Sequence, residues 1–257
     1  MDVAIVTGAG QGIGKEAAIK LASKGLHVVC VSKSNNCKKT ASEIIAKGDS
    51  AEGIILDISD YENAKKIFTD WTHSTSFKQI GVVLAAGILG PNGPFLDSSL
   101  NMWDECLRVN ILGNLAVLQG LLPHMIKERF GRIITFAGGG SAYSFPEFPA
   151  YSASKTAIVR ITENLNEDFK DKGDFIVVCL APGAVDTQML KIVKSSGATV
   201  KTQVDISEPV NFIVEFMLAK SSALSGSFVH VRDNWKDFIN TGKTLSKDSY
   251  WKLRRIE

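Results

Sequence analysis

The sequence predicts an α/β fold with a doubly wound, mainly parallel seven-stranded sheet and helices on both faces. Apolar runs alternate along the chain with segments long enough for helices, and a glycine-rich turn joins the first run to the first helix. The runs are rich in Val, Ile and Leu rather than alternating with polar residues, as buried parallel strands require. No Pro- or Ser-rich linker divides the chain, so we expect one domain over residues 1–257.

Each strand of the predicted sheet corresponds to one apolar run. After the first run, Val3–Val6, the helical spacing of Ile13, Ala17 and Leu21 predicts the first helix, which Gly25 can end. The remaining strands are expected at residues 26–31, 51–56, 80–86, 132–137, 175–180 and 227–232, with helices at 62–71, 100–129, 150–170 and 208–220.

Two segments fall outside this alternation. Residues 184–206 lack clear periodicity, which is typical of a mobile loop or lid, or of a plain connection. Because ligands bind at the carboxyl ends of parallel strands, we interpret 184–206 as a substrate loop. The C-terminal tail, 234–257, is polar, with a few aromatic side chains as docking points.

Composition excludes several classes of partner. Hydrophobic residues make up 45% of the chain, charged residues 22%, and the net charge is only +2. We therefore expect a soluble protein that binds neither nucleic acid nor a membrane. The chain leaves no room for a signal peptide before its first strand, and its longest apolar runs, such as 80–88, are too short for a membrane span. The four Cys and four His are scattered, which favours a cytoplasmic protein without a metal site.

The glycine-rich turn, Thr7-Gly8-Ala9-Gly10-Gln11-Gly12-Ile13-Gly14, stands between the first strand and the first helix. Glycines let the backbone and the helix N-terminus approach an anion where a Cβ would intrude. This placement predicts a Rossmann-type dinucleotide site, although an ordinary strand-to-helix loop is the alternative. The expected cofactor-binding residues of the turn are Gly8, Gly10, Gln11, Gly12, Ile13 and Gly14.

A second motif, Tyr151-Ser152-Ala153-Ser154-Lys155, places a phenol and an ammonium one helical turn apart. A phenol ionises near pH 10 in water, and a neighbouring ammonium, helped by the charge of an oxidised nicotinamide, would lower that pKa. Tyr151 would then exchange protons with a substrate at neutral pH. Such pairs are also common by chance on helix surfaces.

Together these motifs resemble the short-chain dehydrogenase/reductase family, in its single-domain branch, over residues 3–232. The resemblance implies hydride transfer between a nicotinamide and a carbonyl or alcohol carbon, with Tyr151 as acid/base and Lys155 holding the ribose. It also implies that Asn110 supports them through a relay water, and that subunits pair through the helices carrying Asn110 and Tyr151 into a homodimer or homotetramer. The other cofactor contacts that it implies are Asp57, Ile58, Ala86, Gly87, Asn110, Pro182, Gly183, Val185 and Thr187.

One position departs from the family's pattern. The family places a serine thirteen residues before its tyrosine, and here that residue is Gly138, in Ala137-Gly138-Gly139-Gly140-Ser141. Losing such a donor costs on the order of 10²–10³ in rate. We hypothesise that the glycines form a nest of N–H donors and that the Ser141 hydroxyl helps; Tyr143 and Ser144 are alternatives. The competing interpretation is a catalytically weak or inactive NAD(P)-binding sensor. Two smaller departures are Ala85 and Ala181, where the family has asparagines.

The residues at the end of the second strand bear on the choice of cofactor. An acidic residue there would accept the ribose hydroxyls, but this chain has Ser32 and Lys33, which suit a 2′-phosphate. We therefore expect NADP, with NAD as the alternative. The triglycine and the ending Tyr250–Ile256 resemble a branch found in bacterial polysaccharide clusters, which suggests a sugar or nucleotide-sugar as the small-molecule substrate.

Overall fold

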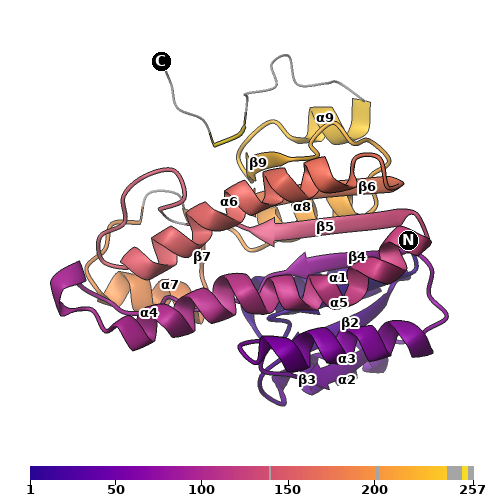
Figure 1. Ribbon diagram of the computed structural model, residues 1–257, viewed down its shortest axis with the longest axis horizontal. Coiled ribbons are helices and arrows are strands. Elements are labelled where there is room, and N and C mark those ends of the chain that lie inside the picture. The colour runs from indigo at the N-terminus through magenta and orange to yellow at the C-terminus, as the bar shows by residue number, and fades with distance from the viewer. Residues whose placement is uncertain (139, 201–202, 242–250, 254–257) are drawn as a thin grey trace.

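In the main sheet of the protein, strands that are far apart in the sequence lie side by side. The computed structural model describes residues 1–138, 140–200, 203–241 and 251–253 (Figure 1). Within them, seven parallel strands follow the spatial order β3-β2-β1-β4-β5-β6-β9. These are β1 (Val3–Thr7), β2 (His27–Ser32), β3 (Ala51–Ile55), β4 (Ile80–Leu84), β5 (Phe130–Phe136), β6 (Asp174–Ala181) and β9 (Ser227–His230). The predicted doubly wound fold is confirmed.

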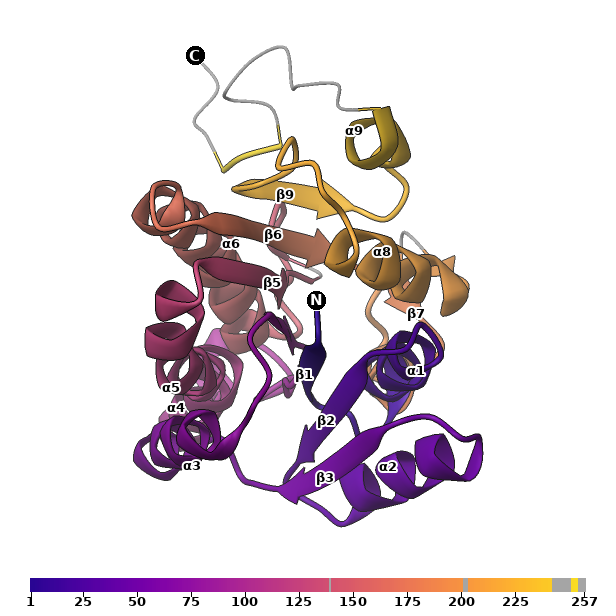
Figure 2. The ribbon, with the colours of Figure 1, turned by 90° about the vertical axis from the view of Figure 1, so that its right-hand side faces the viewer.

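Helices cover both faces of this sheet (Figure 2). One face carries α1 (Gly12–Ala22), α2 (Asn36–Ala46) and α8 (Ser207–Met217), and the other carries α3 (Tyr61–Ser74), α5 (Asn114–Lys127) and α6 (Pro149–Phe169). Alternate residues of β1 pack into the two layers: Ala4 and Val6 face the α1 side, whereas Val3 and Ile5 face the α3 side. All four are fully buried, which explains why the strand is an unbroken apolar run.

The predicted helix over residues 100–129 is observed as one helical stretch, Leu100–Lys127, but its middle is π-helical. The structure divides it into α4 (Leu100–Leu107), a π-helical segment (Arg108–Gly113) and α5. At Gly113 a Cβ would clash with the Ile58 carbonyl, so the widened turn lies hard against the segment after β3. The spacing of apolar residues in the sequence does not reveal a turn that is wider by one residue. Such π-helical segments are often found at functional sites.

The substrate loop is more ordered than expected. Residues 184–206 form β7 (Ala184–Val185), α7 (Gln188–Ser195) and β8 (Gln203–Val204), with β7 and β8 paired in parallel. Helix α7 is only eight residues long, too short to establish a period in the sequence. Its start is fixed by Thr187, whose side chain accepts a hydrogen bond from the Leu190 N–H. In the tail, the structure describes α9 (Lys236–Thr241) and residues 251–253; residues 242–250 and 254–257 lie outside the described part.

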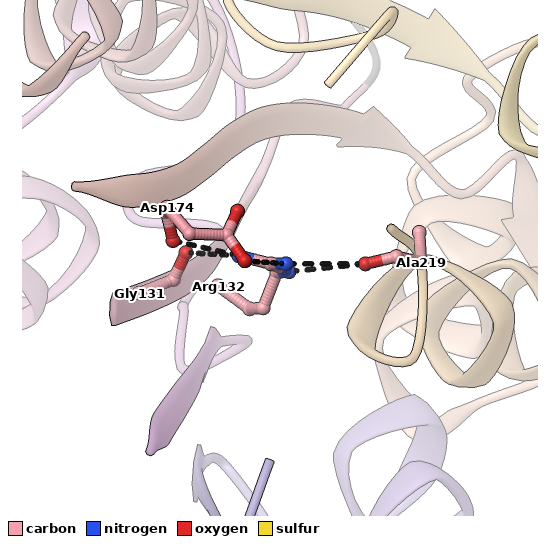
Figure 3. Close-up of polar contacts among 4 residues, drawn as sticks. All are labelled: Gly131, Arg132, Asp174 and Ala219. Atoms are coloured by element: carbon pink, nitrogen blue, oxygen red, sulfur yellow. Dashed lines mark hydrogen bonds and ion pairs between the residues drawn. The ribbon is translucent and has the colours of Figure 1, made fainter. Parts of the chain in front are cut away.

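A buried arginine ties the amino ends of β5 and β6 to the chain after α8 (Figure 3). Arg132 is 3% exposed, and its guanidinium donates to the carbonyls of Gly131, Asp174 and Ala219 and to the Asp174 carboxylate. The Phe130 ring lies under it, 4.4 Å from the guanidinium carbon to the ring centroid. Because it lies at the edge of the sheet opposite the strands' carboxyl ends, Arg132 serves the fold.

Candidate active site

The glycine turn opens onto the N-terminus of α1. Gly8 and Gly12 have φ of +69° and +55°, a region that side chains rarely adopt. A Cβ at Gly14 would lie 2.5 Å from the Gly8 carbonyl oxygen, so only glycine fits there. The helix begins at Gly12, and its N-cap residue, Gln11, makes no side-chain cap. The turn therefore leaves backbone N–H groups and a helix N-terminus available to a pyrophosphate, which is the fit that a dinucleotide requires.

The end of β2 lies beside this turn. A Cβ at Gly10 would be 3.0 Å from the Ser32 hydroxyl oxygen, and that hydroxyl donates to the Ser34 carbonyl. Lys33 is exposed, and its charge contributes to a lowered pKa of Asp57. The larger cause is the Ser59 N–H, which donates to the Asp57 carboxylate at 3.0 Å. The structure thus brings the predicted residues of the adenosine end, Ser32, Lys33 and Asp57, to one edge of the sheet.

Tyr151 and Lys155 lie one turn apart in α6, and both are buried. The Lys155 ammonium is 5.6 Å from the centroid of the Tyr151 ring and donates to the Phe136 carbonyl at 3.0 Å. Burial raises the pKa of Tyr151 and lowers the pKa of Lys155 to about 8. Desolvation of the buried phenol is the largest cause of this raised pKa, and it acts against the lowering that the ammonium and an oxidised nicotinamide are expected to give.

Gly138 lies directly against the tyrosine hydroxyl. A Cβ at this position would be 2.9 Å from Cζ of Tyr151 and closer still to its hydroxyl oxygen. The hydroxyl therefore stands next to the space that the family's serine side chain would occupy.

Ser141 has a different place from the one hypothesised. It is 3% exposed, its Oγ accepts the Gly138 N–H at 3.1 Å, and its own N–H donates to the Gly138 carbonyl. Ser141 therefore closes the turn at residues 138–141 and does not line the cavity described below. Since the Gly138 N–H is already used, it cannot serve an anion-binding nest; Gly139 lies outside the described residues.

Asn110 connects the π-helical segment to its surroundings. Its Oδ1 accepts the Ile88 N–H, and its Nδ2 donates to the Ile88 carbonyl and to the Ser154 hydroxyl, all within 2.9 Å. Ser154 in turn donates to the Tyr151 carbonyl. The Asn110 side chain thus holds the loop after β4 against the first turn of α6, on which the tyrosine lies. Gly87 lies between: a Cβ there would be 3.2 Å from Asn110 Oδ1 and 3.5 Å from Lys155 Nζ.

Sequence reasoning missed Asn114. Its Oδ1 accepts from the Thr7 hydroxyl, and its Nδ2 donates to the Ala86 carbonyl, while the Ala86 N–H donates to the Thr7 hydroxyl. This triangle joins the ends of β1 and β4 to α5, at the place where Ala85 lacks the family's asparagine. The signal was available, because Asn114 lies four residues after Asn110 and so on the same helical face.

A cavity of about 520 Å³ opens above Tyr151. Ile13 and the segment Pro182–Thr187 form one wall, so the glycine turn and the predicted nicotinamide segment meet there; a Cβ at Gly12 would be 3.2 Å from Thr187 Cγ2. The other walls come from the loops after β4 and β5, from α7 and the residues after it, from β9 and the turn after it, and from the tail. Side chains among them are Leu89, Ala142, Tyr143, Phe145, Met189, Leu190, Val193, Thr199, Val200, Phe228, His230, Asp233, Trp251 and Lys252. Sequence reasoning assigned no role to His230 or Asp233.

Two further observations concern the expectations about metal binding and membrane association. Over the described ranges, no group of three His, Cys, Asp or Glu side chains is arranged to hold a metal ion. One described helical stretch, Leu100–Lys127, is long and apolar enough to cross a membrane, with a mean hydropathy of 1.3. Half of its most apolar part is buried inside the protein, as in core helices generally, so this is weak evidence for a membrane span.

Comparisons with known proteins agree with this geometry. A family model described as short chain dehydrogenase matches residues 2–197. The 3-oxoacyl-[acyl-carrier-protein] reductase FabG of Aquifex aeolicus is 30% identical over 238 residues, covering 89% of this chain and 95% of the relative. Dehydrogenase/reductase SDR family member 4 of Mus musculus is 28% identical over 192 residues, covering 74% of this chain and 68% of the relative.

Solved structures share the fold over nearly the whole chain. A protein from Beutenbergia cavernae, described as an NAD(P)-dependent gluconate 5-dehydrogenase with NADP bound at low occupancy, superposes with a TM-score of 0.80 at 28% identity, over 91% of this chain and 96% of the other. A variant of actinorhodin polyketide ketoreductase with NADPH gives 0.80 at 22% identity, over 90% and 95%, which shows the fold alone. Because the family model spans well over half of the chain and the FabG relative aligns along most of both lengths, this chain belongs to the short-chain dehydrogenase/reductase family and is an NAD(P)-dependent oxidoreductase.

Proposed function

We propose that this protein interconverts a carbonyl and an alcohol by hydride transfer, with NADP as its preferred cofactor and a mainly apolar compound as its substrate. One observation carries the proposal: the Tyr151 hydroxyl lies at a cavity that the glycine turn and the segment Pro182–Thr187 bound on one side and apolar side chains bound on the others. A bound nicotinamide supplies or accepts the hydride. The chain's own residues handle the proton.

Tyr151 is proposed as the acid/base. Because burial raises its pKa, the phenol keeps its proton at neutral pH and is ready to donate it to a carbonyl oxygen in the cavity. The phenolate that remains is stabilised by the Lys155 ammonium 5.6 Å from the ring centroid. Lys155 is anchored by the Phe136 carbonyl, and the same ammonium is proposed to hold the ribose hydroxyls.

The cofactor contacts are proposed along the same edge of the sheet. The pyrophosphate would be held by the glycine turn at Gly8, Gly10, Gln11, Gly12, Ile13 and Gly14. The remaining contacts would be Asp57, Ile58, Ala86, Gly87, Asn110, Pro182, Gly183, Val185 and Thr187. Ser32 and Lys33 favour a 2′-phosphate, since no carboxylate ends β2. The NADP of the Beutenbergia structure also supports this choice.

The lining of the cavity bears on the substrate. Free sugars and nucleotide-sugars need a dense array of hydrogen-bonding side chains, whereas this lining is largely aliphatic and aromatic. A ketone or aldehyde with an apolar body fits it better than the sugar substrate that the resemblance suggested.

A purified preparation tests the proposal with NADPH, NADH and a panel of carbonyl compounds. Tyr151→Phe should lower turnover by about 10²-fold or more and leave the NADPH dissociation constant within about two-fold of wild type. Lys33→Ala should weaken NADPH about five-fold and leave NADH unchanged, while Lys127→Ala, an exposed lysine on the far end of α5, should change neither. Equal affinity of the wild type for both cofactors would defeat the NADP preference.

Gly138 also supports a second candidate, a cofactor-binding sensor, because the cavity lacks the family's serine donor. The same assay separates the two. A sensor binds NADPH but consumes none with any carbonyl compound, and its Tyr151→Phe variant has no turnover to lose.

We also propose a cytoplasmic homodimer or homotetramer that pairs through α4, α5 and α6. Large apolar side chains on and beside α4, including Leu96 and Leu100, are exposed, as a subunit interface requires. Light scattering coupled to size exclusion measures the assembly directly, and a monomer at micromolar concentration would contradict it.

A further inference from the structure

The wall of the largely apolar cavity includes an imidazole and a carboxylate close together, those of His230 and Asp233. His230, the last residue of β9, pairs in register with Ala181, which directly precedes the Pro182–Gly183 turn. His230 and Asp233 both line the cavity and belong to one tight turn, in which the Asp233 carboxylate accepts the His230 backbone N–H at 2.7 Å. The strand register therefore presents an imidazole and a carboxylate beside the segment that bounds the reacting end.

The hydrogen bonds of this turn fix the tautomer of His230. Its Nδ1 accepts the Arg232 backbone N–H at 3.1 Å, so Nδ1 carries no proton and the neutral ring carries it on Nε2. Burial lowers the pKa of His230, with the Arg232 charge acting in the same direction and Asp233 opposing them, so the ring is neutral at pH 7. Within the described part of the chain, Nε2 has no hydrogen-bond partner, and neither does Oδ1 of Asp233.

Other polar side chains also line the cavity, among them Tyr143, Tyr151, Thr187, Thr199 and Lys252. Tyr151 lies at the reacting end, and Thr187 caps α7. The Lys252 charge acts on Glu167 of α6, where it helps to lower the pKa of that carboxyl. The apolar part of the lining includes Leu89, Phe145 and Met189. A ligand in the cavity thus meets the Tyr151 phenol, apolar side chains, and the donor and acceptor of His230 and Asp233.

We propose that His230 and Asp233 form a substrate-recognition site for a hydroxyl group separate from the reacting carbonyl. A hydroxyl is the smallest group that both accepts from the imidazole Nε2–H and donates to a carboxylate. This inference rests on the proposed function, and it narrows the substrate to apolar carbonyl compounds that also carry such a hydroxyl. Nothing in it requires a new chemical step.

Binding to the NADP complex tests the proposal independently of turnover. The probes are benzylacetone and its para- and meta-hydroxy analogues, which differ only in the phenolic hydroxyl, and affinity is measured by calorimetry. The wild type should bind at least one hydroxy analogue about five-fold more tightly than benzylacetone, the difference that one neutral hydrogen bond makes. His230→Phe should bind the three probes within about two-fold of one another.

Two further variants make the result specific. His230→Gln keeps an N–H donor and should retain part of the preference, whereas His73→Phe, at an exposed position on α3, should retain all of it. A wild type without preference, or a preference that survives in His230→Phe, overturns the proposal. Failure of the proposed function looks different, because NADPH would then not be consumed with any carbonyl compound while the binding preference persisted.

Discussion

Adding a single methyl group at Gly138 tests whether the position of the tyrosine hydroxyl controls catalysis. In Gly138→Ala the new Cβ would lie 2.9 Å from Tyr151 Cζ and nearer still to its oxygen, whereas ordinary contacts begin at 3.4 Å. The hydroxyl must therefore withdraw by about 1 Å, and a displacement of that size at a reacting group costs up to about 10²-fold in rate. The cost in stability should be about 1–3 kcal/mol, typical of overpacking.

The assay is steady-state NADPH oxidation with the best carbonyl compound from the panel, together with NADPH titration and urea unfolding. We expect kcat of Gly138→Ala to fall about 10- to 100-fold while NADPH affinity stays unchanged, because the glycine turn is not involved. Gly138→Ser introduces the same Cβ and adds a hydroxyl donor, whose worth is about 10²–10³ in rate. Its kcat should therefore exceed that of Gly138→Ala by at least about ten-fold. A Gly138→Ala enzyme as fast as wild type would refute the reasoning, since the hydroxyl would then move at no cost.

Two other perturbations probe the fold and the buried ammonium. Arg132→Met should lower the free energy of unfolding, measured by urea denaturation, by about 2–4 kcal/mol, because the Ala219 carbonyl and the Asp174 carboxylate lose a buried donor. The control is Lys66→Met, which removes an exposed ion pair and should cost less than about 0.5 kcal/mol. Equal losses in the two variants would contradict this reasoning. For Lys155, burial lowers the pKa from 10.5 to about 8, so between these values the unfolded chain holds a proton that the folded chain has lost. The free energy of unfolding should therefore rise from about pH 8 to 10.5 more steeply in wild type than in Lys155→Met, and parallel urea-derived curves would show that the amine titrates normally.

Local signals predicted the scaffold of the site well. The apolar runs, the glycine turn and the spacing of Tyr151 and Lys155 each depend on residues close in sequence, and their positions at the carboxyl edge follow from parallel topology. The π-helical segment at Asn110 was not predictable in this way, because one extra residue in a turn leaves the apolar pattern intact. Nor was the protonation of Tyr151, since its pKa depends on how completely the surrounding layers bury it.

His230, in the wall of the cavity, shows a different limit of prediction from sequence. His230 is one of four scattered histidines, and nothing in its neighbours in sequence marks it as a ligand. Its role depends on the register of β9 with β6 and on a turn that occupies Nδ1. Both are set by residues distant in sequence or by backbone geometry.

Two departures from the family's pattern, at Ala85 and Gly138, have different structural consequences. Near Ala85, where the family has an asparagine, Asn114 joins Thr7 and Ala86, so the ends of β1 and β4 are tied by hydrogen bonds. At Gly138 no side chain takes the serine's place, because Ser141 is committed to the turn and the tyrosine hydroxyl stands against the glycine. A structural hydrogen bond can be supplied from any direction that reaches the same groups, whereas a donor to a reacting oxygen must stand within about 3 Å of one point. The first loss is therefore easily compensated elsewhere in the fold, whereas under the proposed mechanism the second would leave the stabilisation of the substrate oxygen to Tyr151.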